Sequence, residues 1–146
     1  STFDVFNEWI DDYGSTKLKS KGFRIKTSHS ELFSNIYEII KDYIQNDNPK
    51  NDFNIIFNAE RKIIKTPLNL LKNEIWLMPY IISQLNINEI FVFPIKDNHW
   101  PTFDHCFLLN NSPFTDAQKR SPNLPNLAKS ELLKNLNNLL VDIKNK

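Results

Sequence analysis

The sequence contains very little glycine and cysteine, and both shortages limit what the chain can be. Two glycines among 146 residues cannot build the glycine-rich loop that cradles nucleotide phosphates with backbone amides. The single cysteine, Cys106, cannot form an internal disulfide bond, so folding does not depend on an oxidising compartment. We therefore expect no cofactor and a cytoplasmic location.

Long apolar runs and an excess of charge of one sign are also missing. The longest apolar stretch, 75–82, is interrupted by Pro79 and is far shorter than the roughly 20 residues that span a bilayer. Eighteen basic and seventeen acidic residues give a net charge of +1, and only three of the basic residues are arginine. No field of the whole molecule steers it toward nucleic acid or anionic lipid. The sequence therefore predicts no membrane association and argues against nucleic acid as a partner.

The overall composition is that of a globular protein. Hydrophobic residues make up 40% of the sequence and charged residues 24%, which excludes a fibrous or disordered chain. A chain of this length buries about two-thirds of the surface that its unfolded form exposes. We therefore expect residues 1–146 to form a single domain with its own core.

Hydrophobic periodicity predicts an α/β (or α+β) domain, in which helices flank a mixed four-stranded sheet. Its elements follow in the order helix, strand, helix, strand, helix, strand, strand, helix. The predicted helices cover about residues 2–13, 28–44, 67–85 and 127–143. The predicted strands cover residues 22–27, 53–58, 89–95 and 103–109.

Local signals support several of these elements. Ser28 and Glu31 form the pattern of a capping box, which marks the start of a helix. Pro79 should kink or split the helix that contains it, because proline lacks a backbone donor. The run 89–95 is apolar without alternation, which indicates a central strand covered on both faces. We expect it to pair as a hairpin with 103–109.

One short segment concentrates the side chains that can do chemistry. His99, Asp104, His105 and Cys106 are residue types that bind zinc, but their spacing matches no CxxC, HxxxH or HExxH motif. On a strand, residues 104, 105 and 106 would point to alternating faces. Cys106 could act as a nucleophile only beside an imidazole, which would have to be His29 or His99. We therefore predict neither a metal site nor a catalytic group here.

A second set of residues resembles, in letters only, a nuclease motif. Asp52, Glu60 and Lys62 match the D…ExK pattern of the restriction-endonuclease-like nucleases over about eleven residues. The resemblance implies two carboxylates that hold Mg²⁺ and a lysine that positions the water. In that family the Asp and the ExK lie on successive strands, whereas here one predicted strand and its continuation carry both. Charged side chains exposed at the end of a strand are the alternative interpretation.

The stretch 17–26 carries five basic residues and no acidic one. With Phe23 among them, these side chains could form a patch that contacts phosphates and stacks on a base. The alternative is a solvated edge strand, on which lysines block pairing with other chains.

The predicted N-terminal helix places its acidic side chains on one face. Its apolar stripe must face the core, which leaves Asp4, Glu8, Asp11 and Asp12 outside. The same acidic residues stand where a secretory signal would have basic ones, so we expect no export by that route. The acidic face is a candidate surface for binding a basic patch on another protein.

Trp100, in the polar turn before Pro101, is the aromatic residue that we expect to be exposed as an anchor for a partner. The chain resembles small antitoxins and immunity proteins, and also secretion chaperones, in character but in no motif. We therefore predict a stoichiometric inhibitor or immunity protein that covers a toxin or an enzyme. A small metal-dependent hydrolase or nuclease and a secretion chaperone are the alternative functions.

Overall fold

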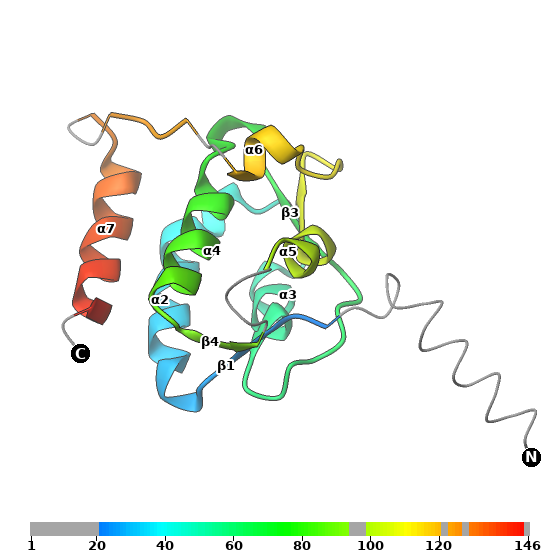
Figure 1. Ribbon diagram of the computed structural model, residues 1–146. Helices are drawn as coiled ribbons and strands as arrows, with labels where there is room; N and C mark the ends of the chain where they lie inside the picture. Colours follow the sequence, from blue (N-terminus) through cyan, green and yellow to red (C-terminus); the bar gives the residue numbers. More distant parts are fainter. Residues whose placement is uncertain (1–20, 94–98, 121–122, 127–128, 145–146) are drawn as a thin grey trace, which may run out of the picture.

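The computed structural model describes residues 21–93, 99–120, 123–126 and 129–144. This part of the chain contains six helices and five short strands (Figure 1). The prediction of a mixed α/β chain is confirmed. The predicted helix 2–13 lies outside the described residues.

The strands are two or three residues long, and three short 3₁₀ turns connect the longer elements. The strands are β1 Phe23–Ile25, β2 Phe57–Asn58, β3 Leu68–Leu70, β4 Phe91–Phe93 and β5 Phe107–Leu109. The helices are α2 Ser30–Ile40, α3 Pro49–Ile56, α4 Leu77–Ile87, α5 Trp100–Cys106, α6 Asp116–Arg120 and α7 Glu131–Lys144. The 3₁₀ turns are η1 Thr27–His29, η2 Lys41–Tyr43 and η3 Lys72–Glu74.

Two small sheets replace the single four-stranded sheet that the sequence predicts. In the first, the order is β2-β1-β4, with β1 parallel to β2 and antiparallel to β4. In the second, β3 pairs in parallel with β5. The central strand is therefore β1 and not β4, and the predicted hairpin between 89–95 and 103–109 is wrong because β4 and β5 belong to different sheets.

A cluster of phenylalanines joins the two sheets. Phe23 of β1 is fully buried, and its ring stacks on Phe91 at 4.5 Å and on Phe57 at 5.8 Å between centroids. It also stacks on Phe107 of the second sheet at 6.4 Å. These short strands are thus held by packing of aromatic side chains more than by long ladders of hydrogen bonds.

The segment before β2 is a helix, although its sequence alternates like a strand. Pro49 lies in the first turn of α3, where its missing N–H leaves no hydrogen bond unmade. Phe53 and Ile56, one helical turn apart, are both buried. The predicted strand 53–58 is reduced to Phe57–Asn58, because burial on one side of a helix explains the apolar residues equally well.

The predicted helix 67–85 is divided into a strand and a later helix. Leu68–Leu70 forms β3, and α4 begins only at Leu77. Pro79 thereby falls in the first turn of α4, where proline is tolerated. Pro79 therefore splits no longer helix, because β3 and the turn η3 occupy the segment before α4, and the prediction of one helix kinked or split at Pro79 is wrong.

The other two predicted helices are present with shorter bounds. α2 begins at Ser30 after η1, and no side-chain hydrogen bond caps it, so the predicted capping box of Ser28 and Glu31 is not formed. α7 packs against α2 and buries Leu136 and its neighbours (Figure 1). Among the described residues, no helix is both long enough and apolar enough to cross a membrane.

Candidate anion-binding site

The residues that the sequence analysis assigned to partner binding are only partly described. Asp4, Glu8, Asp11 and Asp12 lie outside the described residues. The expectation that Trp100 is exposed in a turn is wrong: it is half-buried at the start of α5, where its ring lies 4.2 Å from that of His99 and packs against the core. Its role in binding stays a prediction.

The segment with two histidines and the cysteine is a helix and not a strand. Residues 100–106 form α5, so successive side chains turn by about 100° around the helix axis. Asp104 points outward and forms an ion pair with Lys119 of α6 at 2.7 Å. Cys106 points into the core, and burial raises the pKa of its thiol. A strand would have placed residues 104 and 106 on one face, so the predicted alternation is wrong: on the helix, Asp104 and Cys106 point in different directions.

No cluster of metal-ligating side chains is assembled in the described ranges. Within residues 21–93, 99–120, 123–126 and 129–144, no three His, Cys, Asp or Glu side chains are grouped so that they could hold a metal ion. Asp52 of α3 is buried and accepts a hydrogen bond from the side-chain amide of Asn46 at 2.8 Å. Glu60 lies in the turn after β2 and lines a pocket that Asp52 does not line. The resemblance to D…ExK therefore has no support from the placement of its two carboxylates.

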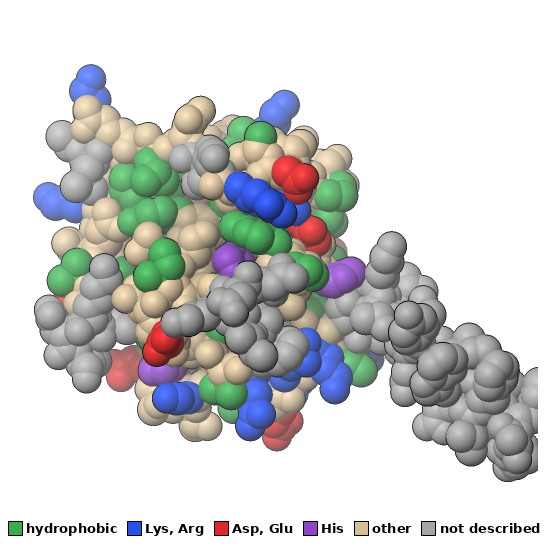
Figure 2. All heavy atoms as spheres, viewed as in Figure 1, with side chains coloured by type: hydrophobic (Ala, Val, Ile, Leu, Met, Phe, Trp, Pro, Cys, Tyr) green, Lys and Arg blue, Asp and Glu red, His purple; other side chains and the backbone are tan. Residues whose placement is uncertain are grey.

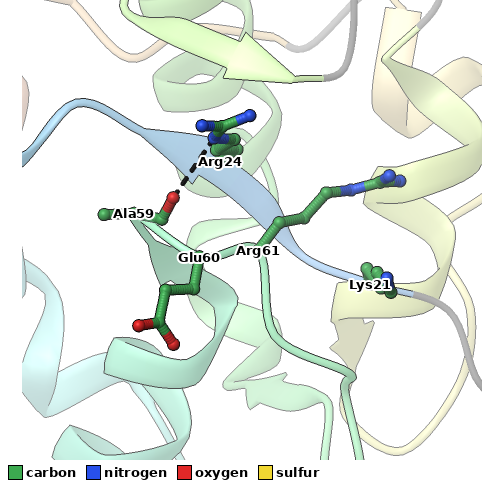
Figure 3. A pocket seen from close by; sticks show the side chains of 5 residues that line it. All are labelled: Lys21, Arg24, Ala59, Glu60 and Arg61. Atoms are coloured by element: carbon green, nitrogen blue, oxygen red, sulfur yellow. Dashed lines mark hydrogen bonds between the residues drawn. The ribbon is translucent and has the colours of Figure 1, made fainter.

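Two residues of the basic run, Lys21 and Arg24, line a pocket of about 510 Å³ that the sequence does not predict. Figure 3 shows Lys21 and Arg24 beside the turn that follows β2, and this turn contributes a further cation, Arg61. In the space-filling view, Lys and Arg side chains gather on the part of the surface where β1 lies in Figure 1 (Figure 2). The lining residues are Lys21, Arg24, Ala59, Glu60 and Arg61.

Gly22 lets the two walls of this pocket approach each other. A Cβ atom at Gly22 would lie 2.2 Å from the carbonyl oxygen of Ile56, so only glycine fits where β1 crosses the end of α3. The amide of Gly22 donates to the carbonyl of Lys62 at 3.0 Å. Lys21 and Ile63 form an antiparallel bridge beside it. Backbone contacts therefore hold the turn against the start of β1.

The turn itself has a defined and strained conformation. Its backbone amide at Glu60 donates to the side-chain oxygen of Asn58 at 2.9 Å, as in an Asx turn. Arg61 has a φ of 52°, a region that residues other than glycine seldom adopt. Such strain costs about 1–3 kcal/mol and persists only where the surroundings impose it. The conformation projects Arg61 toward the pocket that Lys21 also lines.

Hydrogen bonds to backbone carbonyls orient both arginines. Arg24 Nε donates to the carbonyl of Ala59 at 3.2 Å, and this bond is drawn in Figure 3. Arg61 Nε donates to the carbonyl of Gly22 at 3.2 Å. Each bond uses one edge of a guanidinium that carries five donors. The two side chains are thus positioned in advance of any ligand.

The electrostatic balance of the pocket is positive. Three cations face one carboxylate, and in Figure 3 the Glu60 carboxylate points away from the guanidinium of Arg61. Neither Lys21 nor Arg24 forms an ion pair within the described part of the chain. Burial lowers the pKa of Arg61, which means that its charge is partly desolvated, although it remains charged at neutral pH. A bound anion would stabilise the charges of Lys21 and Arg24.

Carboxylates and phosphates are the anions that this arrangement suits. Arginine forks bind both groups through paired N–H donors, and lysine adds a point charge. Stacking on a base is not available from Phe23, because its side chain is fully buried. The interpretation of 17–26 as a base-stacking patch is wrong for this aromatic residue.

Comparison of the chain with protein-family models, with curated proteins and with solved structures finds no match.

Proposed function

We propose that the chain is a stoichiometric protein-binding protein of the inhibitor or immunity type, whose basic pocket holds an acidic segment of a toxin or an enzyme. The observation that supports this proposal is that Lys21, Arg24 and Arg61 line one pocket. Two distant segments of the chain supply these cations, and backbone hydrogen bonds hold the segments together. Charge complementarity of this kind favours fast and specific association with a partner of opposite charge.

An acidic protein segment fits the pocket better than a nucleic acid strand does. Proteins that bind single strands combine a long basic groove with exposed aromatic rings, whereas this pocket is local and Phe23 is buried. The net charge of the chain is only +1. A carboxylate at the rim, Glu60, would also repel a continuous row of phosphates but can lie beside a basic residue of a protein partner.

The proposal includes two binding features outside the pocket, the acidic N-terminal residues and Trp100. The acidic residues Asp4, Glu8, Asp11 and Asp12 would meet a basic part of the same target, and Trp100 would add a contact through the exposed part of its ring. We further propose that the chain acts in the cytoplasm, since its one described cysteine, Cys106, is free and buried. The alternative of a hydrolase has less support, because Asp104 and Asp52 are each engaged by a neighbouring side chain.

The pocket can be tested with a fluorescein-labelled hexaglutamate peptide and fluorescence anisotropy at low ionic strength. We expect Arg24→Gln to weaken binding by roughly three- to tenfold, as for the loss of one partly exposed charge pair. Arg120→Gln is the matched control, because Arg120 is an exposed arginine at the end of α6, away from the pocket. It should change the affinity by less than about twofold.

Two results would contradict the proposal. If Arg120→Gln weakened binding as much as Arg24→Gln, the peptide would be attracted by diffuse charge and not by the pocket. If a labelled oligothymidylate of equal charge bound more tightly than hexaglutamate, the pocket would belong to a nucleic acid site. The inhibitor role itself is tested by co-expression with the product of an adjacent reading frame: growth should be restored by the wild-type chain, and less so by Arg24→Gln.

A further inference from the structure

The basic pocket lies where the described part of the chain begins. Lys21 is the first described residue and also lines the pocket. In Figure 3, the chain runs from Lys21 along β1 to Arg24. The segment 1–20 is therefore joined covalently to the lining of the pocket, and the chain itself keeps any anionic group on that segment near Lys21 and Arg24.

The side chains of residues 1–16 carry only negative charge. This stretch contains four acidic residues and no lysine, arginine or histidine. The five basic residues of the run 17–26 follow directly, and two of them line the pocket. The acidic residues are Asp4, Glu8, Asp11 and Asp12. The chain thus contains an acidic segment, 4–12, of the same chemistry as the segment of a partner that its pocket is proposed to bind.

The acidic segment is close enough in sequence to reach the pocket. Eight residues, 13–20, separate Asp12 from Lys21. An extended chain spans up to about 3.5 Å per residue, so this connection is far longer than a pocket of about 510 Å³ is wide. The entropic cost of closing a loop also grows only slowly with its length. The connection therefore permits Asp11 and Asp12 to meet Arg24.

Covalent attachment favours this internal contact over binding from solution. A short connection gives the attached group an effective concentration on the order of millimolar. One exposed charge pair is weak, but four carboxylates at that concentration would occupy the pocket for much of the time. A separate acidic peptide at micromolar concentration has to compete with them.

The cations of the pocket are prepared for such a contact. Arg24 Nε donates to the carbonyl of Ala59, which leaves the other edge of the guanidinium for a carboxylate. Neither Arg24 nor Lys21 forms an ion pair with a carboxylate of residues 21–93, 99–120, 123–126 or 129–144. Both positive charges are therefore available to the acidic segment.

We propose that the acidic segment 4–12 occupies the basic pocket of its own chain and is displaced when an acidic segment of a partner binds. This inference rests on the proposed function, because it assigns a regulation to the same pocket. Displacement makes a weakly acidic protein a poor competitor, so only a partner with stronger contacts enters the pocket. The released carboxylates are then free to meet a basic part of that partner.

The Nε–H signal of Arg24 in the NMR spectrum of the full chain reports the internal contact without any peptide. We expect this signal to shift in the neutralised variant, Asp4→Asn/Glu8→Gln/Asp11→Asn/Asp12→Asn. The control variant removes the same number of charges at exposed positions that do not line the pocket; it is Asp42→Asn/Asp47→Asn/Glu131→Gln/Asp142→Asn. It should leave the signal in place. An unmoved signal in the neutralised variant, or an equal shift in both variants, would overturn the inference.

The affinity for labelled hexaglutamate measures how far the segment occupies the pocket. The neutralised variant should bind the peptide roughly three- to tenfold more tightly than the wild type. The control variant should differ from the wild type by less than about twofold. Addition of Arg24→Gln to the neutralised variant should remove most of the gain, because both changes act on one contact. A gain that persists without Arg24 would place the segment elsewhere and contradict the inference.

Failure of this inference is distinguishable from failure of the proposed function. If hexaglutamate binds the wild type and the neutralised variant equally and the Arg24 signal stays in place, only the inference is wrong. If the peptide binds neither protein but the Arg24 signal shifts, the internal contact is supported and the role of the pocket in partner binding is wrong. A gain that depends on protein concentration, together with a dimer in sedimentation, would assign the segment to the pocket of a second copy and overturn the inference.

Discussion

Replacement of Gly22 by alanine should destabilise the protein strongly, and for a steric reason alone. The φ angle of Gly22 is not positive, so alanine meets no conformational penalty there. Its methyl group would lie 2.2 Å from the carbonyl oxygen of Ile56, which is more than an ångström inside normal contact, and 2.9 Å from the carbonyl carbon. Because both partners are backbone, β1 or the end of α3 must shift. We expect a loss of about 2–4 kcal/mol in the free energy of unfolding.

Urea unfolding followed by tryptophan fluorescence measures this loss. The midpoint should fall by about 1–2 M if the dependence on urea is unchanged. Ser34→Ala, at an exposed position of α2, is the control and should change the free energy by less than about 0.5 kcal/mol. A loss below about 0.5 kcal/mol for Gly22→Ala would refute the close crossing of β1 and α3. Since the same crossing holds Arg61, the variant should also bind hexaglutamate more weakly.

Three further predictions concern single contacts. Asp104→Asn should lower the free energy of unfolding in urea by about 1–2 kcal/mol, because it leaves the Lys119 ammonium, which is only 6% exposed, without this carboxylate. An unchanged free energy of unfolding would show that Lys119 does not need Asp104. Tyr80→Phe removes a hydrogen bond to Asn137 that links α4 to α7. Amide hydrogen exchange in α7 should therefore become faster, by a factor equivalent to about 1 kcal/mol in the free energy of opening. Burial raises the pKa of Cys106 above its unfolded value, so the native state keeps this proton when the unfolded state loses it. Stability should therefore fall by about 1 kcal/mol as the pH rises from about 7.5 to about 9.5. Cys106→Ala should lack that component of the decline, and an equal decline in both proteins would contradict the explanation.

The helices that the sequence predicts correctly are those with strong local signals. α2 and α7 each have a broad apolar stripe at helical spacing, and their bounds differ from the prediction mainly at the ends. Ends depend on caps and neighbouring turns, as the absence of a capping bond at the start of α2 shows.

The elements that were predicted wrongly are short apolar segments. The stretches 53–57 and 103–107 contain too few residues for a period of 2 to be told from a period of 3.6. Each is a helix that runs directly into two or three residues of strand. The rings of Phe53, Phe57, Phe103 and Phe107 are all buried, and burial on either kind of element produces the same sequence.

The basic pocket could likewise be predicted only in part from the sequence. The run 17–26 was recognised as basic, but Arg61 has no sequence signal that joins it to Lys21 and Arg24. It enters the pocket because Gly22 lets the turn after β2 lie against β1 and because its backbone takes a positive φ. Neither fact can be read from residue types.

By itself, the sequence determined the α/β class, the two amphipathic helices α2 and α7 and the local excess of positive charge, because each depends on neighbouring residues. Only the tertiary structure decided that β1 is the central strand, that β3 pairs with β5, and that Lys21, Arg24 and Arg61 share a pocket. These features depend on contacts between segments about 35 to 70 residues apart, for which the gain from burying the phenylalanine cluster outweighs local preference.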